Sequence, residues 1–479
     1  MSLAYEWGPK MVEPADPLFV PRAREAIRAS HERTGRRILV LDDDPTGSQA
    51  VHGVEAVLSL DTDAIATALE APGSTCFVLT NSRGLSEAEA ASGAIELGRF
   101  ASALEERLGG RVEIVSRSDS TLRGHVMAEL NALASARRES VGRSYDGVLL
   151  VPSYFEAGRF TASDIHWART GDGIVAVGDT EFARDLTFGY SSSDLRLFIE
   201  EKSGGAVLAS EVHSISLDDI RRGGPERIKE LLLDVHDGAF VVVNCVEYAD
   251  LEVMVLGLLA AEDEGRTFLY RSGPSFVPVL AGIEPIAPLD ATTIWPNGAP
   301  PGHGLVVVGS HVGLTNRQLE VLEARAGIER VVIDVEDVVD PARRGETVRR
   351  CASLVRQALR HSDVLLVTGR TLQKGRDGEE SLRIARSVSA AVVAIVLEAL
   401  REHPAWVITK GGITSHDVLV GALGVRRAEV VGQLFAGFVS VFRALESRPE
   451  SLGLPCIVFA GNVGNDGSLA DAVDILRGQ

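Results

Sequence analysis

Short apolar runs alternate with longer stretches of helical periodicity along most of the chain. The segment 87–108, rich in Ala, Leu and Glu, predicts a helix between two such runs. Strands that alternate with helices at this spacing are typical of α/β domains with a mostly parallel sheet. The first buried strands predicted in this way are residues 37–41, 75–79, 112–116 and 147–151.

The alternation is interrupted once and then resumes. Runs at 239–244 and 267–270 extend the first series, and residues 283–304 are rich in Pro and Gly, which predicts a linker. A second series of apolar runs follows at 305–309, 330–334, 364–368, 406–409 and 456–460. We therefore expect an α/β protein of two domains, each with a mostly parallel β-sheet flanked by helices. The expected boundaries are 1–282 for the first domain, 283–304 for the linker and 305–479 for the second domain.

Composition limits the classes of partner. The 479 residues carry a net charge of −19, which argues against nucleic acid or an anionic membrane as the main partner. The longest uncharged apolar run, 387–397, is too short to cross a bilayer, and no secretory signal is expected at the N-terminus. The four cysteines are scattered without a CxxC pair, which argues against a zinc site or a disulfide framework and favours a reducing cytoplasm.

The segment Lys410-Gly-Gly-Ile-Thr-Ser-His-Asp417 is the clearest candidate for a phosphate-binding turn. It follows the predicted strand 406–409 and precedes residues 418–423, which predict the start of a helix. Paired glycines let the backbone approach a ligand closely, and free N–H groups at a helix start favour an anion. Helix packing alone also explains a glycine pair, so the two interpretations stay open at this point.

Polar side chains follow four successive strands of the first series. The first strand ends in Asp42, Asp43 and Asp44, and the next three are followed by 80–83, 118–124 and 152–159. Ligands of α/β proteins bind at the carboxyl ends of parallel strands, and a carboxylate there can accept a proton from a hydroxyl group. The alternative is a solvated cluster that caps the next helix.

Three arginines at these strand ends can each bind a carboxylate or phosphate through a two-point fork. Singly, each is more often an ordinary surface residue. Together with aspartates at equivalent strand ends they predict a site for a small polyhydroxy acid, with arginine for the carboxylate and aspartate for the hydroxyls. The predicted set is Arg83, Arg123, Arg159, Asp43, Asp44 and Asp119. His125, His166 and Asp164 lie near these motifs without metal-ligand spacing and are secondary candidates.

The second series also ends its strands in glycine-bearing turns. These turns are 308–310, 368–370, 410–412 and 460–467, and together they could converge on a nucleotide. A tight turn followed by a helix cap is the alternative at each one. The chain has no GxxxxGK[ST] loop and no GxGxxG after a strand, so a nucleotide would be bound in another way.

In order and combination these motifs resemble the four-carbon acid sugar kinase family, from about Ile38 to about Leu476. The family's Asp-Asp-x-Thr-Gly motif is matched by residues 43–47, and its Asp-Ser-Thr-Leu-Arg-Gly motif by residues 119–124. Residues 152–159 resemble its Pro-x-x-x-x-Glu-Ala-Gly-Arg segment with one residue fewer.

The resemblance implies an N-terminal sugar-acid-binding domain, a C-terminal nucleotide-binding domain, and ATP-dependent phosphorylation of a terminal hydroxyl of a four-carbon sugar acid such as threonate, erythronate or an oxo-tetronate. Asp43 and Asp44 would be catalytic, and Arg83 or Arg123 would hold the substrate carboxylate. Mg²⁺ would bridge the phosphates, with ligands unknown. The implied ATP contacts are Ser310, Lys410, Gly411, Gly412, Thr414, Ser415, Gly461 and Asn462.

The chain also departs from the family pattern. Ile413 stands where many members have Glu, and Ser48-Gln49-Ala50 stands where Ala-Asn-Asp is common. The kinase chemistry is therefore better supported than any named substrate. A homodimer is expected only because most oligomers are symmetric homo-oligomers.

Two other functions fit part of the sequence. Residues 42–46 also match the Asp-x-Asp-x-Thr pattern of haloacid-dehalogenase-like phosphatases, with Asp42 as nucleophile and Asp44 as acid/base. That interpretation needs a suitably placed lysine, which is absent between Lys10 and Lys202. A non-catalytic sensor of sugar acid or nucleotide is the other alternative, because Ile413 replaces the common Glu.

Overall fold

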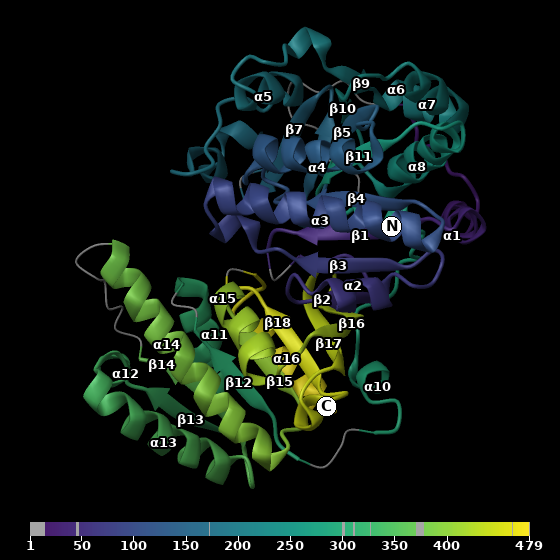
Figure 1. The fold of residues 1–479 in the computed structure, drawn as a ribbon. Helices are drawn as coiled ribbons and strands as arrows, with labels where there is room; N and C mark the ends of the chain where they lie inside the picture. Colours follow the sequence, from purple (N-terminus) through teal and green to yellow (C-terminus); the bar gives the residue numbers. More distant parts are fainter. Residues whose placement is uncertain are drawn as a thin grey trace. The chain divides into compact units, whose positions relative to one another are not determined.

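The computed structural model describes residues 15–44, 47–171, 173–298, 302–309, 312–325, 327–369, 378–461 and 463–478. The chain forms two compact units (Figure 1). The first contains the chain up to Val51 and residues 62–285, and the second contains residues 52–61 and the chain from Ile286 onward. The boundary after Pro285 falls within the Pro-rich segment, whereas the transfer of residues 52–61 to the second unit has no signal in the sequence.

The first unit is built on a parallel sheet whose strands read as unbroken apolar runs because both faces are buried. Every residue of the two strands Arg37–Asp42 and Thr75–Leu79 is buried. In spatial order the strands are β3 (Thr75–Leu79), β1 (Arg37–Asp42), β4 (Val112–Arg117), β11 (Phe268–Ser272), β5 (Gly147–Val151), β10 (Ala239–Val243) and β9 (His213–Ile215).

Helices flank this sheet and pack in groups. Helix α3 (Glu87–Leu108) packs on α4 (Val126–Val141), and α8 (Tyr248–Asp263) packs on α1 (Ala23–Thr34) and α7 (Gly224–Leu233) (Figure 1). The capping box of Ser86 and Glu89 fixes the start of α3 at the position that the sequence predicts. The shorter helices of this unit are α2 (Thr62–Ala68), α5 (Leu195–Lys202), α6 (Leu217–Arg221) and α9 (Phe276–Leu280).

A small antiparallel sheet in the first unit was not anticipated. It consists of β6 (Arg159–Ala162), β7 (Ile165–Thr170) and β8 (Gly173–Ala176). Its first hairpin turns through Ser163 and Asp164, both with positive φ (53° and 62°). Turns of this kind usually contain a glycine, which the Ser-Asp pair lacks, so the sequence gives only a weak turn signal here.

The second unit has a mixed sheet. Five parallel strands are continued by three antiparallel ones, so the sheet is mostly parallel, as expected. The spatial order is β13 (Ile328–Ile333), β14 (Asp363–Thr368), β12 (Leu305–Val308), β15 (Val407–Lys410), β18 (Pro455–Phe459), β17 (Phe438–Glu446), β16 (Arg427–Phe435) and β2 (Val54–Val57).

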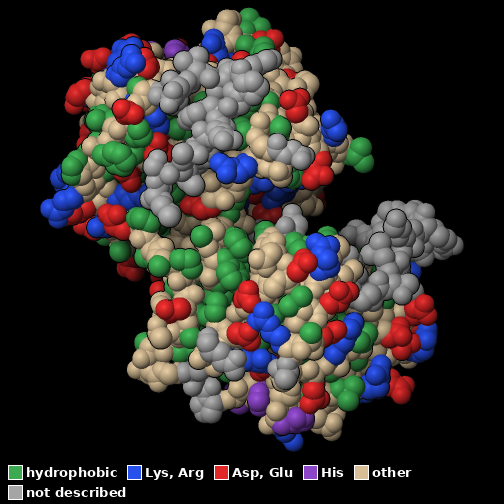
Figure 2. Space-filling model, turned by 180° about the vertical axis from the view of Figure 1, so that it is seen from behind, with side chains coloured by type: hydrophobic (Ala, Val, Ile, Leu, Met, Phe, Trp, Pro, Cys, Tyr) green, Lys and Arg blue, Asp and Glu red, His purple; other side chains and the backbone are tan. Residues whose placement is uncertain are grey.

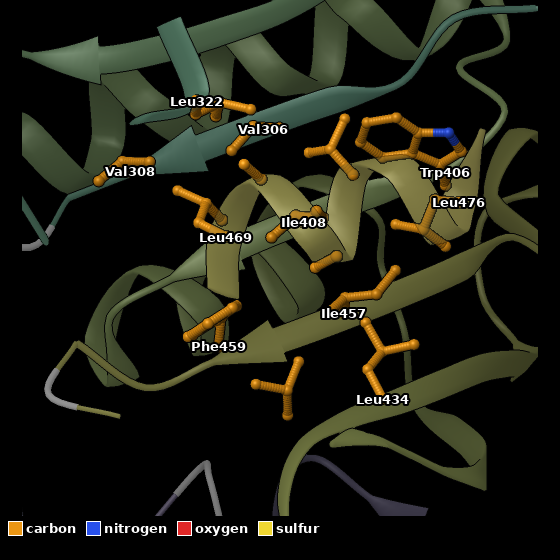
Figure 3. Close-up of a cluster of buried hydrophobic side chains, with 14 of the residues drawn as sticks. Val306, Val308, Leu322, Trp406, Ile408, Leu434, Ile457, Phe459, Leu469 and Leu476 are labelled. Atoms are coloured by element: carbon orange, nitrogen blue, oxygen red, sulfur yellow. The ribbon is translucent and has the colours of Figure 1, made fainter. Parts of the chain in front are cut away.

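The core of this unit lies between the central strands and two helices, α11 (Gly313–Ala324) and α16 (Ser468–Leu476). Ile408 and Ile457 of the strands and Leu469 of α16 belong to this cluster, and Trp406 lies at one end of it beside Leu476 (Figure 3). Apart from the helix that follows β15, the other α-helices described in this unit are α10 (Ala291–Ile294), α12 (Val335–Val339), α13 (Pro341–Ala358) and α14 (Gly378–Ala399), which packs on α13.

The helix after β15 begins earlier than predicted. We expected a helical start at 418–423, but α15 already spans Gly412–His416 and continues as a π-helical segment, Asp417–Ala422. The prediction was wrong because Gly411, with φ of 111°, ends the strand and lets the helix start at once. The glycine pair thus lies at the helix start itself.

Two surface features bear on partners. Among the described residues, no helix is long and apolar enough to cross a membrane. On the face in Figure 2, the described acidic and basic side chains are interspersed and form no continuous basic patch.

The four cysteine side chains are buried and form no disulfide.

Candidate functional site

The carboxyl ends of five neighbouring strands lie at one edge of the first sheet. Asp42 is in register with Leu79 of β3 and with Arg117 of β4. Arg117 is in register with Ser272 of β11, which in turn is in register with Val151 of β5. The polar residues that follow these strands are therefore brought together, as the sequence predicts.

Asp42 is held inside the protein. Its Oδ1 accepts a 2.7 Å bond from Arg117 Nη1, and the backbone at Gly47 lies against its carboxylate. A Cβ atom at position 47 would come within 1.9 Å of Asp42 Oδ1, so only glycine fits there. Burial raises the pKa of Asp42 to about 7, despite the attraction of Arg117.

Asp43 is also buried, but only one of its two carboxylate oxygens accepts a hydrogen bond from a described group. Its Oδ2 accepts the backbone N–H of Asp119 at 3.2 Å. Its Oδ1 lies 3.6 Å from both Arg83 Nη2 and Arg117 Nη1, and no described group donates a hydrogen bond to it. Burial raises the pKa of Asp43 to about 6, although Arg83, Arg117 and Arg271 all lower it. This carboxylate can accept a proton near neutral pH.

Arg83 is the shared cation of this cluster. It lies on a single turn of 3₁₀ helix, Ser82–Gly84, directly after β3, and forms an ion pair with Asp44. It also lies 3.6 Å from Asp43 and 3.7 Å from Asp119. Three carboxylates of its own chain therefore surround this guanidinium group.

Asp119 and Arg123 form a second pair on the loop after β4. Arg123 Nε donates to Asp119 Oδ2 at 2.6 Å, and Arg123 Nη1 lies 3.6 Å from Asp185. The Thr121 hydroxyl also donates to Asp119. Burial by itself would raise the pKa of Asp119, but Arg83, Arg123 and Thr121 together bring it below its ordinary value.

Arg159 has a different environment. Its Nη1 donates to Ser120 Oγ at 3.1 Å, and its guanidinium carbon lies 5.5 Å from the ring centre of Phe182 and 6.0 Å from that of Tyr154. No carboxylate of the described residues lies within 4.0 Å of it. Burial lowers the pKa of Arg159, because the aromatic neighbours do not replace lost hydration with a full negative charge.

The three secondary candidates have structural roles. His166 is fully buried between Thr161 Oγ1 and the carbonyl of Ser120, at 3.0 and 2.8 Å, and burial lowers its pKa to about 4. Asp164 accepts the hydroxyl of Ser214 at 2.5 Å. The His125 ring lies 3.0 Å from the carbonyl of Leu85 and packs edge-on against Phe188.

The strand ends of the second unit also adjoin one another. Lys410 is in register with Val308 on one side and with Phe459 on the other. The N–H of Gly309 donates to the carbonyl of Lys410 at 3.2 Å, and that of Gly411 donates to the carbonyl of Phe459 at 2.9 Å. Three of the four predicted glycine-bearing ends are thereby joined, and the end of β14 lies beside β12.

Lys410 is a fully buried lysine without a counter-charge. Its Nζ donates to the carbonyl of Ala460 at 2.9 Å and lies 3.9 Å above the ring centre of Phe459. No carboxylate of the described residues lies within ion-pair distance of Nζ. Burial lowers the pKa of Lys410 to about 7. An anion bound beside it would restore the charged form.

The first turn of α15 presents the other predicted contacts. Its N–H groups, from Gly412 to Thr414, have no acceptor within the helix. Ser415 is buried and its Oγ donates to the carbonyl of Gly411 at 2.8 Å, so it shapes the turn. Gly461 accepts the hydroxyl of Thr315 at 3.0 Å through its carbonyl. Two predicted contacts, Ser310 and Asn462, lie outside the described residues.

Comparison with known families decides what these two units are. Residues 38–280 match the family described as the sugar-binding N-terminal domain, and residues 305–469 match the nucleotide-binding C-terminal domain. The chain belongs to the four-carbon acid sugar kinase family. A search of curated protein sequences found no match.

Solved structures share the fold of this family member. A protein from Salmonella typhimurium LT2, described as a putative tRNA synthase, has a TM-score of 0.64 at 15% identity, covering 91% of this chain and 98% of its own. A Haemophilus influenzae protein of the family DUF1537 has a TM-score of 0.60 at 15% identity, covering 91% of this chain and 99% of its own.

Three residues of the sugar-binding domain escaped the sequence analysis. Arg117 and Arg271 lie in strands β4 and β11, and both contribute to the electrostatics of Asp43. An arginine near the carboxyl end of an apolar strand could have been recognised in the sequence as a possible partner for the site carboxylates. Phe182, which contacts two arginines of the site, lies in an irregular segment with no such signal.

The metal expected for this family has no dedicated cluster in the described parts of the chain. No group of three or more His, Cys, Asp or Glu side chains there has an arrangement that could hold a metal ion.

Proposed function

We propose that this protein is an ATP-dependent cytoplasmic kinase that phosphorylates a terminal hydroxyl of a four-carbon sugar acid such as threonate, erythronate or an oxo-tetronate. Asp43 carries the proposal. It is a buried carboxylate with one unbonded oxygen, among arginines, in a sugar-binding domain. A general base with a pKa of about 6 is largely ionised at neutral pH and can take the proton of an attacking hydroxyl.

The neighbouring residues have separate parts in this proposal. Asp44 shares Arg83 with Asp43 and orients the hydroxyl, while Asp119 accepts a bond from another substrate hydroxyl. In the nucleotide-binding domain, the amides from Gly412 to Thr414 and the ammonium of Lys410 contact the phosphates of ATP, whereas the amide of Gly411 is already bonded to the carbonyl of Phe459. Mg²⁺ would neutralise phosphate charge during transfer.

The geometry opposes the phosphatase alternative. A nucleophilic aspartate must reach the phosphorus atom as an ionised carboxylate. Asp42 is instead bonded to Arg117, packed against Gly47, and has a pKa raised to about 7. Thr80 donates its hydroxyl to the carbonyl of Asp42 at 2.8 Å and serves the backbone.

The test is ADP release from ATP and Mg²⁺ against threonate, erythronate and their 2-oxo and 3-oxo forms. The proposal expects turnover with at least one of these acids and loss of turnover in Asp43→Asn. Binding of both ligands without turnover would make the protein a sensor. Failure to bind ATP would remove the proposal altogether.

A further inference from the structure

The arginines around the sugar-acid site differ in how far their charge is already neutralised. Arg117 is paired with Asp42, and Arg271 with Glu129. Arg83 and Arg123 each have aspartate partners, as described above. Arg159 alone, among these five, has no carboxylate of the described chain within ion-pair distance. The only hydrogen bond from its side chain to a described residue goes to a neutral hydroxyl, that of Ser120.

Two aromatic rings lie near the guanidinium group of Arg159, which has no ion-pair partner among the described residues. Phe182 lies 5.5 Å from the guanidinium carbon of Arg159 and 5.1 Å from that of Arg123. Ring contacts of this length attract a cation without neutralising it. The Nε and Nη2 groups of Arg159 donate to no described residue, and neither atom is enclosed without a partner. Two donors of the fork are therefore left for a ligand.

The ring of Phe182 is fixed in place by its own segment. It lies in a 3₁₀ turn, Glu181–Arg184, after which Asp185 Oδ1 accepts the N–H groups of Thr187 and Phe188 at 2.9 and 3.0 Å. The Tyr190 hydroxyl then donates to the carbonyl of Thr121 at 2.7 Å. This bond ties the segment to the loop that carries Asp119 and Arg123.

Ser120, the partner of Arg159, is fixed from the other side. The carbonyl of Ser120 accepts the Nε2–H of His166, and His166 Nδ1 accepts the hydroxyl of Thr161. His166 keeps this tautomer because burial holds it neutral. The position of the Arg159 guanidinium group is thus fixed by the hydrogen bond to Ser120 and by contacts with the rings of Phe182 and Tyr154.

We propose that Arg159 binds the carboxylate of the sugar acid and that Phe182 is a positioning residue that holds the guanidinium groups of Arg159 and Arg123 for this contact. The inference rests on the proposed function and assigns the acid group of its substrate. Arg83 then serves the catalytic aspartates and leaves the carboxylate to Arg159. A ligand that lacks the negative charge gains nothing from Arg159.

The test uses the full chain and the four-carbon acid that the wild-type protein phosphorylates. Arg159→Gln is expected to raise KM for this acid about 10- to 100-fold, the range for loss of a charged hydrogen-bonded contact. Its inhibition constant for the neutral amide of the same acid stays within about twofold of wild type. Arg159→Lys restores part of the affinity, and Arg99→Gln, at an exposed surface ion pair, is the control.

Phe182→Leu is expected to raise KM for the acid about 3- to 10-fold with kcat nearly unchanged, by loss of the cation–π contacts. Phe182→Tyr keeps the ring and the wild-type KM. Phe188→Leu is the matched control, because Phe188 lies in the same segment and contacts His125 instead of an arginine. ATP binding, measured on every variant, reports whether the chain is folded.

The outcomes separate the two proposals. If the wild-type protein neither binds nor phosphorylates any four-carbon acid, the proposed function and this inference both fail. If the wild type is active but Arg159→Gln binds acid and amide as wild type does, only the inference fails. Equal KM values in Phe182→Leu and Phe188→Leu would remove the role of Phe182. If Arg159→Gln loses ATP binding, the comparison is made on Arg159→Lys and Phe182→Leu.

Discussion

The backbone of Gly309 lies directly against the side chain of Thr414, so that a Cβ atom at position 309 would come within 2.0 Å of Thr414 Oγ1. This close approach joins the end of β12 to the first turn of α15. It also explains why a glycine follows the apolar run there, since any larger residue would displace Thr414 from the turn that carries the proposed phosphate contacts.

Gly309→Ala is therefore expected to weaken ATP binding at least about 10-fold, because a clash this short forces the turn to move by more than packed groups allow. Sugar-acid binding is expected to stay within twofold of wild type. Isothermal titration with each ligand measures both. Gly345→Ala is the control in the same unit, because the added methyl group meets only the flexible end of Arg349 at 3.4 Å. Unchanged ATP affinity in Gly309→Ala would contradict this role for the Gly309–Thr414 contact.

Asp43→Asn is expected to separate stability from activity. The pKa of Asp43 is raised to about 6, so the folded protein binds this proton more tightly than the unfolded chain does. The stability that this proton provides is fully present below the unfolded pKa and is lost as pH rises through about 6. The neutral amide avoids this loss, so the variant is more stable than wild type by about 1–3 kcal/mol at pH 8 and by nearly nothing at pH 4.

Urea unfolding of the ligand-free protein at the two pH values measures this difference. Asp218→Asn, at an exposed ion pair with Arg222, is the control. Phosphoryl transfer by Asp43→Asn falls at least about 100-fold if Asp43 is the base. Equal stability of variant and wild type at pH 8 would show that Asp43 is ionised in the folded protein at no cost.

Lys410 is expected to take up a proton when ATP binds. Its lowered pKa of about 7 leaves most of the ammonium group deprotonated at pH 8, and a neighbouring phosphate favours the charged form. Titration of ATP in two buffers of different ionisation enthalpy at pH 8 measures the uptake. Lys410→Met abolishes it. Absence of uptake in the wild type would place the phosphates away from Lys410.

The same pKa gives a stability trend of opposite sign to that of Asp43. The pKa of Lys410 falls from 10.5 in the unfolded chain to about 7 in the folded protein, so the folded protein binds this proton less tightly. The stability that neutral Lys410 provides is fully present above pH 10.5 and is lost as pH falls through about 7. Lys410→Met is therefore expected to gain stability over wild type as pH falls from 9 to 6. Urea unfolding at these two values shows the trend, and a constant difference would contradict it.

Arg83→Gln is expected to destabilise the ligand-free protein by about 1–3 kcal/mol at pH 8, because it leaves partly buried carboxylates without their shared cation. The loss shrinks toward pH 4, where Asp43 is increasingly protonated. The double variant Arg83→Gln with Asp44→Asn recovers part of it. Chemical denaturation of the four proteins of this cycle measures the coupling, and strict additivity would show that Arg83 and Asp44 do not interact.

Much of the fold could be predicted because buried parallel strands are continuous in sequence. The strand 75–79 and the helix 87–108 have the predicted limits, since apolar runs and a capping box are local signals. The strands β2 and β16 gave no such signal. Their pairing joins residues 54–57 to 427–430, and no local pattern encodes a contact across that distance in the chain.

The proximity of the candidate site residues could be predicted from the sequence, whereas their charge states and contacts could not. Strand ends of a parallel sheet must meet, so Asp43, Asp119 and Arg159 could be grouped from the sequence alone. Which arginine keeps an unneutralised charge depends on three-dimensional neighbours such as Asp185 and Phe182. The raised pKa of Asp43 likewise follows from burial, which three adjacent aspartates in a sequence do not indicate.

The ten residues 52–61 have a consequence for how the protein can be made and divided. They leave the first unit after Val51, supply strand β2 to the edge of the second sheet, and return at Thr62. A fragment that starts at Ile286 would lack this strand and expose the backbone of β16 as an open edge prone to aggregation. During synthesis, the second sheet can be completed only after its last strands emerge and pair with a segment translated some 370 residues earlier. The second unit therefore cannot complete its sheet without residues 52–61, and the segment from Ile286 onward is not an independently folding domain.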